Sequence, residues 1–125
     1  MFHVLIVAAG GAIGATLRHL TNLAMLRIAG PAFPWGTLVV NIVGCLAMGI
    51  FIELLARRFD GSAELRLFVA TGLLGGFTTF SAFSLDVAVL YGRGAVVQAF
   101  SYVAASVLLS IAALFVGLWL AKTLA

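Results

Sequence analysis

The chain has 125 residues, of which 64% are hydrophobic and only 9% are charged, and its formal net charge is +3. A soluble domain of this length could not bury so much apolar surface, so the composition excludes a water-soluble fold and predicts an integral membrane protein. The basic residues lie mostly at the ends of apolar segments, where they act as topology and headgroup anchors and not as a nucleic-acid surface.

A spanning helix needs about 20 apolar residues, so the length admits four spans with short loops and no domain outside the membrane. The N-terminus lacks the basic segment that begins a cleavable signal peptide. We therefore predict an all-α chain that forms one transmembrane domain over residues 1–125. Its expected spans are about 4–26, 37–56, 65–91 and 96–120.

The first span contains a small-xxx-small spacing and an internal charge. Gly10 and Gly14 would let another helix approach closely. Arg18 lies far from both ends of the span, which is costly and indicates a functional residue. The alternative is that Arg18 snorkels to the interface. His19 beside it is expected to be interfacial, and not a ligand.

The second span follows a loop over residues 30–36 that contains two prolines. Thr37 and Asn41 are four residues apart and share one helix face. Asn41 either bonds a neighbouring helix or faces a polar path, and the sequence leaves both readings open. The single cysteine, Cys45, cannot form a disulfide within the chain and is expected to be a small packing residue.

The third span contains the most unusual stretch of the chain, residues 72–84, with the sequence GLLGGFTTFSAFS. Each interior glycine costs a helix about 1 kcal/mol relative to alanine, and Thr78 and Thr79 add β-branched stiffness. Thr78 falls at the middle of the apolar segment. We therefore predict a helix broken at mid-membrane, which survives only when it is buried in protein or lines a wet path. The alternative is a continuous helix whose glycines serve close packing.

The fourth span carries Tyr102, Ser106 and Ser110 at every fourth position, which places their hydroxyls on one slowly drifting stripe. Serines in membrane helices commonly bond back to a carbonyl of their own helix, and that reading stays open. A stripe of three hydroxyls favours a polar helix face or a path.

The charges suggest a weak preference for one orientation. Four spans put the N-terminus, the second loop and the C-terminus on one side of the membrane. That side holds Arg57, Arg58, Arg66 and Lys122. The other side holds Arg27 and Arg93, and also Arg18 if it snorkels there. Because this bias is small, the chain is expected to insert in both orientations. An antiparallel homodimer would then bring two broken helices together across a two-fold axis.

The interior contains hydrogen-bond donors and lacks carboxylates near the middle of the membrane, which suits an anion and disfavours a proton-coupled or cation-selective site. The deep polar residues are Thr37, Asn41, Thr78, Thr79, Ser81, Ser84, Tyr102, Ser106 and Ser110. Phe77, Phe80 and Phe83 recur around the predicted break, where composition alone indicates packing. The sequence has no metal-ligand cluster and no nucleophile–base set, so we expect no enzyme.

Three motifs in order resemble the Fluc/CrcB family of fluoride channels over essentially the whole chain. They are GGAIGATLR at residues 10–18, GTLVVN at 36–41 and GGFTTFSAFS at 75–84. The resemblance implies a dual-topology antiparallel homodimer in the cytoplasmic (inner) membrane, surrounded by lipid. It also implies passive, selective export of fluoride that lowers the toxicity of the ion, and a pore role for the phenylalanines in place of packing.

The resemblance also implies roles for individual residues. Fluoride would pass Asn41, Phe80 and Phe83, with Thr37, Thr79, Ser81, Tyr102, Ser106 and Ser110 completing its pathway. Arg18 would shape a vestibule, and the backbone carbonyls of Gly75 and Thr78 would bind a structural sodium ion. Ala82 departs from the family, which often has threonine there, and the role of the acidic Asp86 stays open.

Two other functions compete with this one. A small multidrug exporter also has four spans and dual topology, but it would need a deep glutamate in the first span, which this sequence lacks. A purely structural membrane subunit is the other alternative, and the donor track without carboxylates argues against it.

Overall fold

The computed structural model describes residues 1–124, all of whose regular structure is helical. Four helical segments are long and apolar enough to cross a membrane, which confirms the predicted four-span, all-α class. They are α1 (Phe2–Ala29), α2 (Trp35–Arg58), a composite third segment within Ala63–Gly92, and α6 (Val96–Leu124).

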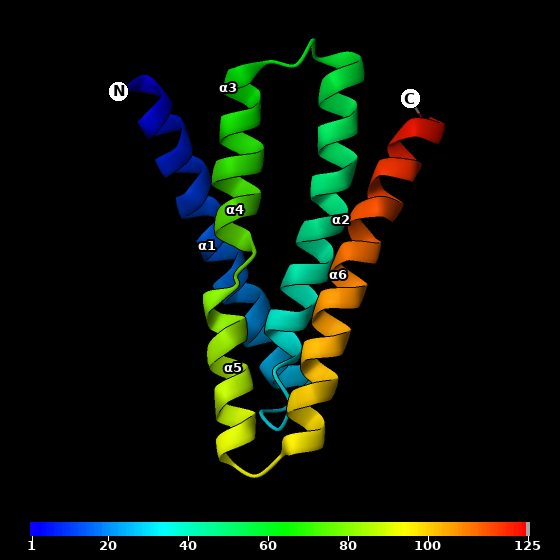
Figure 1. The fold of residues 1–125 in the computed structure, drawn as a ribbon. Coiled ribbons are helices and arrows are strands. Elements are labelled where there is room, and N and C mark those ends of the chain that lie inside the picture. Colours follow the sequence, from blue (N-terminus) through cyan, green and yellow to red (C-terminus); the bar gives the residue numbers. More distant parts are fainter. Residues whose placement is uncertain (125) are drawn as a thin grey trace.

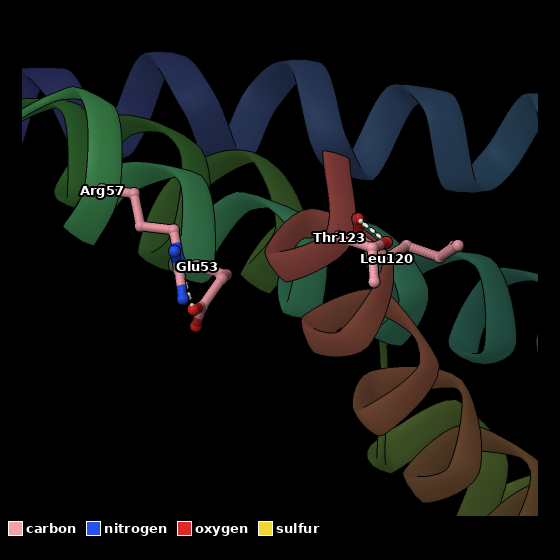
Figure 2. A network of polar contacts seen from close by, with 4 residues as sticks. All are labelled: Glu53, Arg57, Leu120 and Thr123. Atoms are coloured by element: carbon pink, nitrogen blue, oxygen red, sulfur yellow. Dashed lines mark hydrogen bonds and ion pairs between the residues drawn. The ribbon is translucent and has the colours of Figure 1, made fainter. Parts of the chain in front are cut away.

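The segments run alternately up and down, and both turns at one end are short (Figure 1). The N-terminus, the turn after α2 and the end of α6 lie at the other end, as predicted for four spans. Glu53 and Arg57 form an ion pair there, with Nε and Oε1 2.7 Å apart (Figure 2). Such an exposed pair contributes at most about 1 kcal/mol.

The third segment consists of four pieces. It begins with α3 (Ala63–Arg66), which Ser62 caps by accepting a hydrogen bond from the Leu65 N–H at 3.3 Å. It continues as the π-helix η1 (Leu67–Leu74) and as α4 (Gly75–Phe77). It ends with α5 (Ser81–Gly92).

Helical geometry is interrupted between α4 and α5. Thr78 is extended, with φ −82° and ψ 160°, and the next helix begins at Ser81. We call Thr78–Phe80 the interruption. Its predicted depth, at the middle of a membrane, stays a prediction.

Glycines bring α1 into backbone contact with the third segment. A Cβ on Gly10 would lie 2.5 Å from the Phe68 carbonyl oxygen, and one on Gly14 would collide with the Leu73 carbonyl oxygen. On the facing side, a Cβ on Gly76 would lie 2.8 Å from the Gly11 carbonyl oxygen. The small-xxx-small spacing therefore serves close helix packing, as predicted, and glycines of the third segment share that role.

A second pair of glycines joins α2 to α6, which run in the same direction side by side (Figure 1). A Cβ on Gly49 would collide with the Leu114 carbonyl oxygen, and one on Gly117 would collide with that of Leu46. Toward the other end of this pair lies the buried core, formed by Leu38, Phe83, Leu90, Ala99 and Tyr102. Many other large apolar side chains are exposed, as expected for a surface that meets lipid.

We predict that Gly14→Ala destabilises the chain by about 1–3 kcal/mol, because the new Cβ must displace the backbone at Leu73. Gly92→Ala is the matched control, since a Cβ there meets nothing within 4 Å. The midpoint of denaturant unfolding in detergent measures both changes. Equal midpoints for the two variants would contradict the backbone contact.

Candidate functional site

A cavity of about 430 Å³ lies where α2 and α6 meet the interruption. Most of the predicted site residues line it, although they come from three segments far apart in the sequence. The lining residues are Asn41, Cys45, Gly75, Thr78, Thr79, Phe80, Phe83, Ser106, Val107, Ser110 and Ile111. The structure brings these residues together, while their roles stay predictions.

The Asn41 side chain holds the interruption through two hydrogen bonds. Its Nδ2 donates to the Thr79 carbonyl oxygen at 2.9 Å, and its Oδ1 accepts from the Thr79 N–H at 2.8 Å. Both readings of Asn41 are thus compatible, because it bonds a neighbouring segment and also lines the cavity. A carboxamide nitrogen carries two N–H donors, so one remains for a ligand.

Further hydrogen bonds close the two helix ends beside the interruption. The Thr78 N–H and Oγ1 both donate to the Leu74 carbonyl oxygen, at 3.0 and 2.9 Å. The Thr79 Oγ1 accepts from the Ala82 N–H at 3.1 Å and lies 3.3 Å from the Ser81 hydroxyl. These side chains replace part of the hydrogen bonding that a continuous helix would supply.

Several backbone carbonyls at the interruption and just before it are left without such partners. Within residues 1–124, no hydrogen bond ends at the carbonyl oxygens of Gly75, Gly76 or Thr78. The same residues hold no cluster of three or more His, Cys, Asp or Glu side chains. A cation bound here would therefore need oxygen ligands from the backbone, which suits a hard ion.

The two phenylalanines differ in exposure. The Phe80 side chain is 76% exposed in the single chain, whereas that of Phe83 is 8% exposed and belongs to the core. Their ring centroids lie 5.5 Å apart at an interplanar angle of 54°, so the rings are tilted and not stacked. The edge of the Phe80 ring can therefore face the cavity while the Phe83 ring packs in the core.

The hydroxyl stripe of α6 is buried. Tyr102 is fully buried and donates to Asp86 Oδ2 at 3.0 Å. The hydroxyl oxygens of Ser106 and Ser110 are buried and have no hydrogen-bond partner among the described residues. They do not bond back to their own helix, so that alternative is wrong. Each unpaired buried hydroxyl costs folding free energy, which indicates that a ligand or a water molecule forms the missing hydrogen bond.

Some predicted residues lie outside the cavity. Thr37 lines a second cavity of about 360 Å³ near the 30–36 loop, together with Asp86 and Arg93. Ser81 and Tyr102 lie next to the first cavity without lining it, and Arg18 on α1 lines neither cavity.

Two residues were missed or left open by sequence reasoning. Cys45 was expected to be a packing residue, but it lines the first cavity. Its position four residues after Asn41 was the available signal, because residues at that spacing share a helix face. Asp86 was left without a role, and the structure makes it the acceptor of the Tyr102 hydroxyl.

We predict that Asn41→Asp destabilises the chain by about 1–3 kcal/mol, because a carboxylate cannot donate to Thr79 and would face its carbonyl oxygen. Gln98→Glu makes the same amide-to-carboxylate change at an exposed position and should have little effect. Denaturant midpoints in detergent compare the two variants. An Asn41→Asp chain as stable as wild type would show that the two bonds do not hold the interruption.

Comparison with known proteins identifies close relatives. The family described as CrcB-like protein, Camphor Resistance (CrcB), matches residues 5–118. A fluoride-specific ion channel FluC from Mesorhizobium japonicum is 63% identical over 99% of both chains. Proteins of the same name from Chelativorans sp. and from Rhizobium etli strain CIAT 652 are 62% and 57% identical, over 99% and 100% of both chains.

Proposed function

The chain belongs to the CrcB-like protein family, and from this premise we propose that it is a fluoride channel. In this proposal fluoride leaves the cell passively across the cytoplasmic membrane, which lowers its toxic concentration inside. The observation that carries the proposal is the pair of buried hydroxyls, on Ser106 and Ser110, that lack a partner within the described chain. The relatives' names supply the identity of the ion.

The polar groups of the cavity suit an anion. An anion that leaves water needs hydrogen-bond donors in place of its hydration shell. Asn41, Ser106 and Ser110 offer N–H or O–H groups, and no carboxylate is among the residues that line this cavity. A cation pathway would instead be expected to carry acidic side chains.

The phenylalanines supply a second kind of contact in this proposal. A phenyl ring is positive at its edge, so Phe80 and Phe83 can each present an edge to fluoride where the passage is narrow and dry. Their shared position at the cavity and their tilted arrangement support this role.

A second copy of the chain would complete the site. Phe80 is 76% exposed in a single chain, and the cavity that it lines has no cover on that side. We propose that an antiparallel partner packs there, as part of a dual-topology homodimer. The near balance of basic residues between the two ends supports insertion in both orientations.

Sodium fits the interruption as a structural ion. The unpartnered carbonyl oxygens of Gly75 and Thr78 are ligands of the type that hard cations prefer. A bound cation would stabilise these carbonyls, and its charge would raise the local potential for an anion nearby.

Reconstituted protein tests the function directly. Proteoliposomes loaded with fluoride should release it when the purified chain is present, and those loaded with chloride should not. A fluoride electrode records the initial efflux rate per chain. Equal efflux of the two ions, or no fluoride efflux from correctly assembled protein, would contradict a fluoride-selective channel.

We predict that Phe80→Ile reduces fluoride efflux by orders of magnitude, while the unfolding free energy changes by only about 1 kcal/mol. Isoleucine keeps hydrophobic bulk but has no positive ring edge. Phe80 is a cleaner test than Phe83, because Phe83 also packs in the core. Phe80→Met is a graded control, since its polarisable thioether partly fills the gap. Near-normal efflux in Phe80→Ile would show that the Phe80 ring only packs and does not contact fluoride.

We predict that replacing sodium by potassium lowers the thermal stability of the assembled protein without abolishing the fold. Thr78→Ala should keep the sodium response, because the ion binds a carbonyl and not the hydroxyl. Gly75→Pro should lose it, because proline disturbs the backbone at Gly75, whose N–H bonds to Ala70 and Gly72. Melting curves in the two salts measure the response. A wild-type protein indifferent to sodium would exclude the structural ion.

A further inference from the structure

The facing sides of α2 and α6 are in constant register. The two helices run parallel, and each step of four residues along α2 meets a step of four along α6. Three pairs are in contact, namely Thr37 with Tyr102, Cys45 with Ser110, and Gly49 with Leu114. The same spacing places Asn41 opposite Ser106, and both residues line the cavity.

The polar part of this register ends at the pair of Cys45 and Ser110. At the next pair, a Cβ on Gly49 would collide with the Leu114 carbonyl oxygen, so the two backbones touch. Leu114 has no side-chain donor. An anion that follows the donors of α2 and α6 therefore meets Cys45 and Ser110 last, before the helices close.

The Cys45 side chain is only partly buried and lines the cavity. The Ser110 hydroxyl lies within hydrogen-bonding reach of the Cys45 thiol, but it has no hydrogen bond of good geometry among the described residues. Ser106, one turn before Ser110, is 5% exposed and also has an unpartnered hydroxyl in the same cavity. These buried donors need an acceptor, and the neighbouring thiol is placed to contact the same acceptor.

We propose that Cys45 is a pathway residue, whose thiol contacts fluoride opposite Ser110 at the last donor step of the α2–α6 track. This inference rests on the proposed function and deepens it. An S–H group is a weaker donor than a hydroxyl or an amide. A weak contact at the end of the track favours release, since conduction requires that an ion both enters and leaves its sites.

Substitution at Cys45 tests the contact. Cys45→Ala removes the donor without adding bulk and should lower fluoride efflux between about three- and tenfold, the size of one lost hydrogen bond. Cys45→Ser keeps a donor and should retain efflux within about twofold of wild type. Val43→Ala, on the other side of the same helix, controls for a simple loss of side-chain volume. Equal efflux in wild type, Cys45→Ala and Cys45→Ser would overturn the proposal.

A thiol reagent provides an independent test. Methyl methanethiosulfonate is small and neutral, and its sulfenyl sulfur is attacked by the Cys45 thiolate. A disulfide to a methylthio group forms, the reagent's own S–S bond breaks, methanesulfinate leaves, and the thiol proton passes to buffer. The added group should block efflux in wild type, and Cys45→Ser should be insensitive.

Mass spectrometry of the assembled protein separates the outcomes. Full modification with unchanged efflux would overturn the proposal. The proposal requires that the cavity is open to the reagent. It would therefore also be overturned if the Cys45 thiol of the folded wild type resisted the reagent at alkaline pH while the same thiol in the unfolded chain reacted. A wild-type protein without fluoride efflux would instead refute the proposed function, whereas the modification of Cys45 would still be measurable.

Discussion

The paired hydrogen bonds between Asn41 and Thr79 are the interaction on which the site depends. An interrupted helix leaves backbone donors and acceptors that lipid cannot satisfy. One carboxamide satisfies both groups of Thr79 from the neighbouring helix, so the chain stays extended there without losing those bonds. The cavity lies directly beside these two bonds, and Gly75 and Thr78, whose carbonyls remain unpaired, line it together with Asn41 and Thr79.

The spans and several site residues could be predicted from the sequence because their signals are local. Apolar runs define the four helices, and the Gly10–Gly14 spacing predicts a close helix contact. The stripe of Tyr102, Ser106 and Ser110 follows from helical periodicity.

What the sequence could not predict depends on tertiary pairing. The partner of Asn41 is 38 residues away, and no local pattern identifies Thr79 among the other polar groups. The π-helix η1 was also missed, since its apolar sequence is compatible with an ordinary α-helix. Cys45 was assigned to packing because a lone cysteine has no motif, and its place in the cavity depends on the register between α2 and α6.

Glycine contacts stiffen two pairs of segments and also join these pairs to each other. Backbone touches backbone between α1 and the third segment, and again between α2 and α6. Neither pair can shear without a collision of main-chain atoms, and the pairs are held to each other where Gly36 meets Asn22 and Gly44 meets the Thr78 side chain. The cavity lies where the second pair meets the interruption, so its walls are held by close contacts on more than one side. A cavity walled in this way resists a change of width, because widening it requires main-chain atoms to move.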